Sequence, residues 1–397
     1  MNTTRRGTPD FLLLLLTFTL VTFGLIMVFS ASSMSAAYYY SGDALYFTKK
    51  QILGIVLGII GMFICMNIHH TKLKKLTPLF FIGVLIALVL VPFIGIDVKG
   101  ARSWFAIGPL QLQPSEFAKV AVVMYLAALI SKKEDRFRDF KKGLIPALVI
   151  VGMVAFLIML QPDFGSAAIL FMGALLVIIV GGANLKQLAF LGAIGGALAS
   201  FVLVIMFLVN SEFGYRMERI TTFLDPWADE TGAGFHVIQS LYAFGHGGWT
   251  GAGFGQSIQK LHFLPAPHND FIFSIIGEEL GFLGSSLFLL VYLLFIWRGI
   301  IVALRATDTF ASLTGIGIIG TIAIQALINL GGVTNSIPLT GVTLPLISYG
   351  GTSVLVTLAS LGILLGISRD YNREAEEAHS RGSAAAHNTR RKQAASR

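Results

Sequence analysis

The feature that most constrains this chain is a series of long apolar stretches that carry almost no charge. A helix needs about 20 mostly apolar residues to cross the hydrocarbon core of a bilayer. Only 13% of the residues are charged, which leaves too little polar surface to coat a water-soluble globule. The pattern excludes a cytosolic enzyme, a DNA-binding domain and a disordered chain, and it predicts an all-α integral membrane protein. Ten stretches are expected to be transmembrane helices: 11–31, 47–68, 76–94, 115–131, 144–160, 165–182, 187–209, 270–297, 309–333 and 343–367.

The lysine and arginine positions predict the orientation of these ten helices. If the N-terminus is cytoplasmic, most of the 29 basic residues fall on inner segments, as the positive-inside rule requires. Both termini are therefore expected to face the cytoplasm. A large outer loop, about 210–269, then separates the seventh and eighth spans. The membrane domain is expected to cover 1–370, and the basic tail 371–397, which lacks apolar periodicity, is predicted to be disordered.

Polar clusters gather at the predicted outer ends of the spans. Charges at membrane depth are costly, so each needs a partner or a function. Glu116 and Lys119 are three residues apart at the start of the fourth span, and they are expected to pair. They form either a structural salt bridge or a polar wall on which Lys119 or Arg102 binds an anion. Asp163 begins the sixth span, where it either caps the helix or lines the same site.

The predicted outer loop carries two further basic residues, Arg216 and Arg219, and a glycine-dense stretch at 245–255. Glycines let backbone amides approach a phosphate group closely. The stretch fits no known phosphate-binding loop, and a flexible lid is the favoured interpretation. The histidines of this loop have no metal-binding spacing.

Asp270 begins the eighth span at its predicted outer end, directly after a segment stiffened by two prolines. It either caps the helix or acts as a general base at the boundary between water and lipid. Glu278 and Glu279 follow at membrane depth and must face protein or water, with their role left open. Ser348 and Ser353 lie in a glycine-rich part of the tenth span. Its irregular backbone lines a cavity, packs small residues, or does both.

A set of motifs in this chain resembles the SEDS family (shape, elongation, division and sporulation), the group of RodA, FtsW and SpoVE. The set covers nearly the whole chain except the tail and is highly specific. Ile276-Gly277-Glu278-Glu279 and Gly341-Val342-Thr343 are closer to the division and sporulation members. The matching residues are, in order, Gly100-Ala101-Arg102-Ser103-Trp104, Gln113-Pro114-Ser115-Glu116-Phe117-Ala118-Lys119, Gln161-Pro162-Asp163-Phe164-Gly165, Phe223-Leu224-Asp225-Pro226-Trp227, Gln239-Ser240, Phe263-Leu264-Pro265, Asp270-Phe271-Ile272-Phe273, Gly277-Glu278-Glu279-Leu280-Gly281 and Leu344-Pro345-Leu346-Ile347-Ser348-Tyr349-Gly350-Gly351-Thr352-Ser353.

The resemblance implies a ten-helix peptidoglycan glycosyltransferase that polymerises lipid II at the outer face of the bacterial cytoplasmic membrane. Septal or spore cell-wall synthesis is the expected process. The implied partners are a class B penicillin-binding protein (a transpeptidase), lipid II and an undecaprenyl-diphosphate-linked glycan, and no nucleic acid. The essential aspartate of the family matches Asp270. Many members read Pro-Glu and His-Thr-Asp where this chain has Pro265-Ala266-Pro267 and His268-Asn269-Asp270, so the roles of these neighbours stay open.

The chemistry expected from this resemblance is an inverting transfer in which Asp270 deprotonates the acceptor sugar. The leaving diphosphate needs stabilising positive charge. Arg102 and Lys119 are the first candidates, with or without a divalent cation such as Mg²⁺ or Mn²⁺, and Arg216 and Arg219 are weaker ones. Two alternatives stay open. A lipid II flippase would need a polar path to the cytoplasmic face, and a non-catalytic scaffold for a transpeptidase would not need the carboxylate of Asp270.

Overall fold

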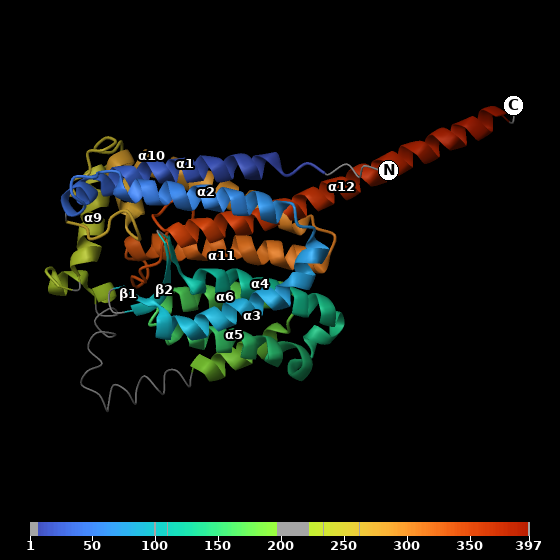
Figure 1. Ribbon diagram of the computed structural model, residues 1–397, viewed down its shortest axis with the longest axis horizontal. Coiled ribbons are helices and arrows are strands. Elements are labelled where there is room, and N and C mark those ends of the chain that lie inside the picture. Colours follow the sequence, from blue (N-terminus) through green and yellow to red (C-terminus); the bar gives the residue numbers. More distant parts are fainter. Residues whose placement is uncertain are drawn as a thin grey trace.

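The computed structural model describes residues 7–98, 101–108, 110–196, 222–232, 234–261 and 263–395. Within these ranges, eight helices are long and apolar enough to cross a membrane. They lie side by side in a bundle, with α9, a short sheet and several loops at one end (Figure 1). We call this end the sheet end. The helix α12 leaves the bundle at the opposite end (Figure 1).

The helices follow the apolar stretches of the sequence closely. Short 3₁₀ and π turns also occur at 134–138, 140–144 and 226–229. The helices are α1 (Phe11–Tyr39), α2 (Tyr46–Met66), α3 (His70–Ile94), α4 (Pro114–Lys133), α5 (Ile145–Met159), α6 (Phe164–Val180), α9 (Phe235–Gly247), α10 (Ile272–Leu304), α11 (Thr309–Val333) and α12 (Gly351–Ala395).

Each predicted span except the seventh coincides with one of these helices. For the seventh, 187–209, the backbone is helical over 185–196, and residues 197–209 lie outside the described ranges. The sixth, α6, has 17 residues, and the fifth reaches 20 residues only when the π turn at 140–144 is added to α5. The all-α membrane fold is therefore confirmed, whereas the count of ten spans stays a prediction.

Of the predictions about the C-terminal part of the chain, the start of the tenth span is wrong, and the disorder of the tail stays a prediction. The tenth span begins at Gly351 rather than at 343, because Pro345 cannot donate in a helical ladder and Leu346 has a left-handed φ of 68°. The helix α12 runs on to Ala395, through most of the tail 371–397. Alanine, glutamate and arginine favour helix, and a helix that already exists needs no new nucleus to continue.

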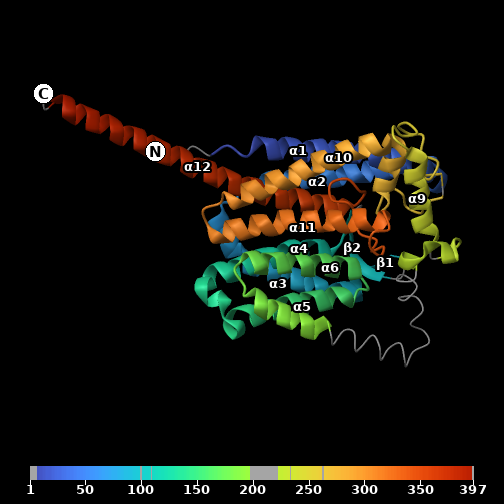
Figure 2. The same ribbon diagram turned by 180° about the vertical axis from the view of Figure 1, so that it is seen from behind.

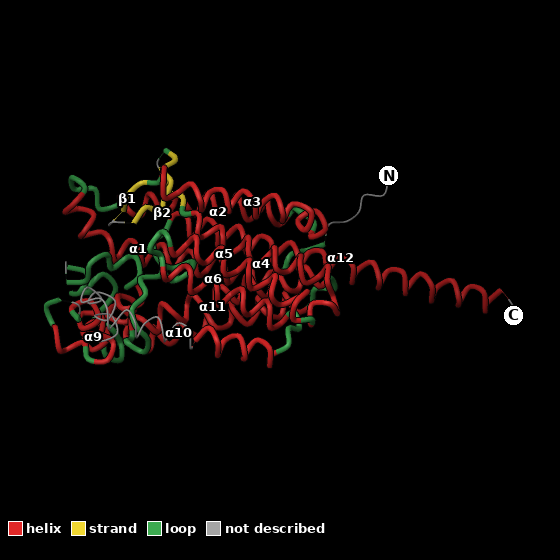
Figure 3. The backbone as a smooth tube through the Cα atoms, turned by 90° about the horizontal axis from the view of Figure 1, so that it is seen from below, coloured by secondary structure: helices red, strands yellow, loops and turns green. Residues whose placement is uncertain are grey.

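The sequence analysis did not predict the sheet that caps the bundle. It has three antiparallel strands in the order β1-β2-β3, and Figure 3 shows it in yellow at one end of the helices. The strands are too short to give a clear alternating pattern. Their bounds are β1 (Ile96–Val98), β2 (Ala101–Ile107) and β3 (Leu110–Leu112).

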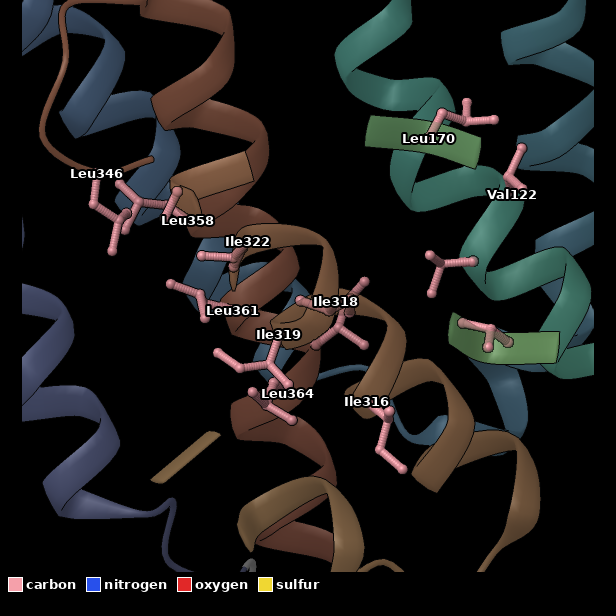
Figure 4. Close-up of a cluster of buried hydrophobic side chains, with 14 of the residues drawn as sticks. Val122, Leu170, Ile316, Ile318, Ile319, Ile322, Leu346, Leu358, Leu361 and Leu364 are labelled. Atoms are coloured by element: carbon pink, nitrogen blue, oxygen red, sulfur yellow. The ribbon is translucent and has the colours of Figure 1, made fainter. Parts of the chain in front are cut away.

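The helices α11 and α12 form the centre of the bundle. Their apolar windows are 72% and 78% buried, against 28% for those of α2 and α3. Figure 2 shows them between two groups of helices, with α1, α2 and α10 on one side and α3 to α6 on the other. Isoleucines of α11 (Ile319 and Ile322) lie near leucines of α12 (Leu361 and Leu364) in this core (Figure 4). The exposed apolar faces of the outer helices are left for lipid.

Candidate active site

Asp270 lies at the sheet end, two residues before α10 begins, and is partly exposed. The Nδ2 atom of Asn329 on α11 donates to the backbone carbonyl of Asp270 at 2.7 Å and to the carbonyl of Val342 at 2.7 Å. Gly341 has a φ of 71°, and a Cβ atom built on it would lie 3.8 Å from Oδ2 of Asp270. The backbone of Asp270 is thus held at the mouth of α10, and its carboxylate lies beside the backbone that leads from α11 to α12.

Aromatic rings support the residues just before Asp270. The carbonyl of His268 accepts from the backbone N–H of Tyr349 at 2.8 Å, and its buried ring lies 4.1 Å from that of Phe47 between centroids. The ring of Tyr349 contacts both of these rings, at 5.5 Å from His268 and 5.2 Å from Phe47 between centroids. Three segments far apart in the sequence therefore meet behind Asp270.

The non-helical segment 341–350 is shaped by its own polar groups. The Oγ atom of Ser348 accepts from the backbone N–H of Leu344 at 2.8 Å. Gln51 of α2 donates to the carbonyl of Ser348 at 3.2 Å and accepts from the N–H of Gly350 at 3.1 Å. These bonds satisfy backbone groups that would otherwise be unpaired at membrane depth. Ser353 is partly exposed on the first turn of α12, and its role stays a prediction.

Glu116 and Lys119 form the expected ion pair, with 2.8 Å between Oε1 and Nζ, and both are buried. The ammonium group of Lys119 also donates to Oε1 of Gln325 at 2.7 Å, and Gln325 donates to the carbonyl of Thr343 at 3.0 Å. The pair therefore connects α4 to α11 and to the segment 341–350. A cavity of about 30 Å³ adjoins it, lined in part by Glu116, Lys119, Thr321, Gln325, Thr357 and Ser360.

Asp163 has the capping role that the sequence analysis allowed. Its Oδ1 accepts from the N–H of Ser166 at 3.0 Å at the start of α6. Its Oδ2 accepts from Nε2 of Gln113 at 2.9 Å and from Oγ of Ser115 at 3.3 Å, so it also joins α6 to α4. The backbone N–H of Gln113 donates to the hydroxyl of Thr352 at 3.3 Å, which extends the connection to α12.

Arg102 lies on β2 with an exposed side chain, in register with Asp97 of β1. The next residue, Ser103, is buried and donates to the carbonyl of Gln161 at 3.0 Å. The sheet is thus attached to the turn between α5 and α6, while Arg102 faces outward. Of the predicted cations in the described ranges, Arg102 is the exposed one and Lys119 is the buried one.

Glu278 holds the glycine-rich loop against α10. Its side chain is completely buried, and its Oε1 accepts from the N–H of Ile258 at 2.9 Å and lies 2.8 Å from Nδ1 of His246. Its Oε2 accepts from the hydroxyl of Ser257 and from the N–H of Gln259. This carboxylate supports the backbone of the loop that leads to Asp270.

Glu279 faces the other way, toward α1. Its Oε1 accepts from Nζ of Lys260 at 2.7 Å and from Oγ of Ser30 at 2.6 Å. Both charged side chains are buried, with exposed fractions of 5% for Lys260 and 0% for Glu279. The pair ties the loop to both α1 and α10.

The helix α10 is broken at Gly281, which has a φ of 66° and a ψ of −168°. The broken helix pairs its backbone with the loop: the N–H of Phe282 donates to the carbonyl of Gly248 at 2.9 Å, and the N–H of Ala252 donates to the carbonyl of Glu278 at 2.9 Å. A Cβ atom at Gly281 would lie 2.2 Å from the backbone nitrogen of Gly251. The glycine-dense stretch therefore serves a close backbone approach, and it is held in place rather than being the flexible lid favoured from the sequence.

The structure brings most of the predicted clusters together through one segment. Residues 341–352 contact Asp270 through Asn329, the Glu116–Lys119 pair through Gln325, and the Asp163 cap through Gln113. Glu278 and Glu279 instead hold the loop before Asp270. Arg216 and Arg219 lie outside the residues that the structure describes.

Several residues at this junction were missed from the sequence. Asn329 and Gln325 are polar residues inside an apolar stretch, a signal that could have found both. Gln51 gives the same signal within α2. Lys260 could not have been found in this way, because it lies in a polar loop and its burial is a tertiary effect.

One group of metal-ligating side chains occurs in the described parts of the chain: ligand atoms of His69, His70 and Asp370 lie within 4.8 Å of one another. Asp370 is 19 residues beyond the start of α12, about 28 Å along the helix. The group is therefore at the opposite end of the bundle from Asp270 and is not part of the candidate active site.

The chain matches a family model described as cell cycle protein, the FtsW, RodA and SpoVE family, over residues 11–373. It is 44% identical over 373 residues to stage V sporulation protein E of Bacillus subtilis, covering 94% of this chain and 100% of that protein. It is 40% identical over 361 residues to a probable peptidoglycan glycosyltransferase FtsW of Trichlorobacter lovleyi, covering 90% of this chain and 93% of that protein.

Solved structures share the fold. A chain in the structure of a peptidoglycan synthase complex that coordinates polymerization and crosslinking is 31% identical, with a TM-score of 0.75 over 91% of this chain and 98% of that one. The rod shape determining protein RodA of Thermus thermophilus is 28% identical, with a TM-score of 0.65 over 91% of this chain and 97% of that one. With the family model matched over nearly the whole membrane bundle, this chain belongs to the FtsW, RodA and SpoVE family of cell cycle proteins.

Proposed function

We propose that this chain is a peptidoglycan glycosyltransferase that polymerises lipid II into glycan strands at the outer face of the bacterial cytoplasmic membrane. The activity named for the FtsW relatives supports this reaction. The observation that carries it is the position of Asp270, a partly exposed carboxylate at the mouth of a membrane-spanning helix. The reacting sugars of a lipid-linked substrate lie at such a boundary between water and lipid.

In the proposed reaction, the Asp270 carboxylate takes the proton of the 4-hydroxyl group on the acceptor's N-acetylglucosamine. A bond forms between that oxygen and the anomeric carbon of the growing strand. The bond from this carbon to the diphosphate breaks, and undecaprenyl diphosphate leaves with the bonding electron pair. The anomeric configuration is inverted, whereas attack by Asp270 itself as a nucleophile would lead to retention.

The leaving diphosphate gains negative charge as the bond breaks and needs a cation nearby. Arg102 is the favoured candidate, because its guanidinium is exposed and suits phosphate geometry. Lys119 is a weaker candidate, because it is buried and already donates to Glu116 and Gln325. A divalent ion at Asp270 would take its other ligands from substrate phosphates and water, which is the usual coordination of Mg²⁺.

The sheet end is proposed to face outward, with both chain termini in the cytoplasm. The opposite end carries Lys72, Lys74 and Lys75 at the start of α3, together with the basic turn at 136–142. Such clusters are typical of the cytoplasmic side. The similarity to a chain of a peptidoglycan synthase complex supports a class B penicillin-binding protein as the partner. The 44% identity to stage V sporulation protein E favours spore or septal wall synthesis.

The test is glycan-strand formation from lipid II by the purified chain, with and without its cognate transpeptidase, for the wild type and Asp270→Asn. We expect polymer from the wild type and none from a mutant that still elutes as a folded monodisperse protein. Asp308→Asn is the matched control, because it changes a helix-capping carboxylate at the start of α11, at the opposite end of the bundle from Asp270. Equal polymer from wild type and Asp270→Asn would return Asp270 to helix capping. If neither makes polymer with the partner present, a flippase or a scaffold becomes the better account.

A further inference from the structure

A second polar cavity lies at the opposite end of the bundle from Asp270. It has a volume of about 120 Å³, room for several water molecules. It lies where the chain before α1 and the corner between α2 and α3 meet α12, close to where α12 leaves the bundle (Figure 1). Its lining residues are Gly7, Met66, Asn67, Ile68, His69, Arg369, Asp370 and Arg373. The proposed reaction does not involve this cavity.

The charged groups of the cavity are two arginines and one carboxylate, together with His69. Arg369 is held in place by donating to the carbonyl of Gly7 at 3.0 Å and to Oδ1 of Asn67 at 2.9 Å. The carboxylate of Asp370 lies 2.7 Å from Nδ1 of His70, just outside the cavity. With the histidines neutral, the lining therefore carries a net positive charge.

The tautomer of His69 decides which ligand this geometry suits. As the N-cap residue of α3, His69 accepts through Nδ1 from the N–H of Thr71 at 3.3 Å, which places the ring proton on Nε2. This Nε2 atom lies 3.3 Å from Nη2 of Arg373. The N–H groups of His69 and Arg373 thus lie side by side at the cavity, with Oδ2 of Asp370 3.7 Å from Nε2 of His69. Such an arrangement suits an anionic oxygen, and the guanidinium opposes a metal cation at the nearby His69, His70 and Asp370 group.

The surroundings of the cavity suit a lipid. Ile60 and Ile64 of α2 are one helical turn apart and are 50% and 59% exposed, just before Met66 at the cavity. An acyl chain that packs along this face would bring its headgroup to the arginines. Basic pockets between transmembrane helices are known binding sites for anionic headgroups, and arginine is well matched to phosphate oxygens.

We propose that this cavity binds a phosphate-bearing anion, with Arg373, His69 and Arg369 as the donors. The headgroup of an anionic phospholipid is the source that the exposed apolar face of α2 favours, and free phosphate is the other source of the same chemistry. A ligand here would join the segment before α1, the corner between α2 and α3, and α12, which stabilises the end of the bundle farthest from the proposed reaction.

The experiment measures the melting temperature of the purified full-length chain in detergent as lipid is added. The probes are short-chain phosphatidylglycerol, phosphatidylcholine of the same chain length, inorganic phosphate and Zn²⁺. We expect phosphatidylglycerol to raise the melting temperature and phosphatidylcholine not to do so. Arg373→Gln should weaken the phosphatidylglycerol effect about tenfold in concentration. Lys75→Gln is the matched control, because it removes one exposed positive charge at the same end and should leave the effect unchanged.

Arg373→Lys provides a variant that keeps the charge, and we expect it to recover part of the binding if Arg373→Gln folds poorly. Competition by inorganic phosphate would support the site with free phosphate as the source, and phosphatidylglycerol binding without such competition would support the lipid. Equal effects of Arg373→Gln and Lys75→Gln would overturn the proposal, because general surface charge would then explain the binding. Stabilisation by Zn²⁺ that Asp370→Asn abolishes, with no response to phosphatidylglycerol, would overturn it in favour of a metal site.

Discussion

The buried ion pair between Lys260 and Glu279 offers the sharpest test of how the loop before Asp270 is held. Its Nζ and Oε1 atoms are 2.7 Å apart, and neither side chain is more than 5% exposed. Glu279→Gln would leave the Lys260 ammonium buried without a counter-charge, next to neutral oxygens alone: the introduced amide and the hydroxyl of Ser30, 3.1 Å away. Removing one partner of a buried pair leaves an uncompensated charge and costs about 3–5 kcal/mol. We expect a loss of that size in the free energy of unfolding.

The measurement is reversible unfolding in mixed micelles for the wild type, Glu279→Gln, Lys260→Met and the double variant. Because the double variant leaves no unpaired charge, its loss should be smaller than the sum of the single losses by about 0.5–3 kcal/mol. Glycan polymerisation should fall with Glu279→Gln, since the loop leads directly to Asp270. A loss below about 0.5 kcal/mol for Glu279→Gln, or strictly additive losses, would refute the reasoning.

Three further predictions concern backbone and electrostatics. Gly281→Ala should lower the free energy of unfolding by more than about 1 kcal/mol, because the φ of 66° at Gly281 and the adjacent loop amide disfavour a Cβ atom. Gly83→Ala is the control in the same unfolding assay: a Cβ atom there would meet open space within α3, so the variant should be neutral or stabilising. Burial opposes ionisation of Asp10, but the hydrogen bond and charge of Arg298 hold the pKa of Asp10 below 3.8. The stabilisation that ionised Asp10 gives the folded state is present above the pKa of Asp10 in the unfolded chain, and it is lost as the pH falls through the lower pKa of the folded state. Melting temperatures measured from pH 7 to 3 should show this loss in the wild type and not in Asp10→Asn. Asn329→Ala should lower the polymerisation rate about tenfold or more with little change in the amount of folded protein, and an unchanged rate would show that the Asn329 contacts do not position Asp270.

Much of the candidate site could be predicted from local patterns. The Glu116–Lys119 pair follows from a spacing of three residues on one helix, and Asp163 caps a helix that its own neighbours begin. Asp270 is found at the mouth of α10 because a proline-stiffened segment precedes an apolar run. These features depend on residues that are close in the sequence, so a linear pattern contains the information needed.

The glycine-dense stretch shows where local reasoning failed. Its composition favoured a flexible lid, but its amides and carbonyls pair with a helix that is broken at Gly281. The sheet was missed for a related reason: its strands are short and pack mainly against one another and against α3 and α12. The tail 371–397 was predicted to be disordered because it has no apolar face, and its alanine, glutamate and arginine residues favour the helix that continues from α12.

By itself, the sequence determined that the chain is an all-helical membrane protein and where most of its spans lie, because the length of an apolar run is a local property set against a fixed bilayer thickness. It also determined which polar residues come near the ends of those spans. Only the tertiary structure decided what these residues contact. Glu278 and Glu279 are adjacent in the sequence, yet Glu278 supports the backbone at 257–259, whereas Glu279 binds Lys260 and Ser30. Ser30 lies 249 residues before Glu279 in the sequence. Partners at such separation are chosen by how the helices pack, and no local pattern contains that choice.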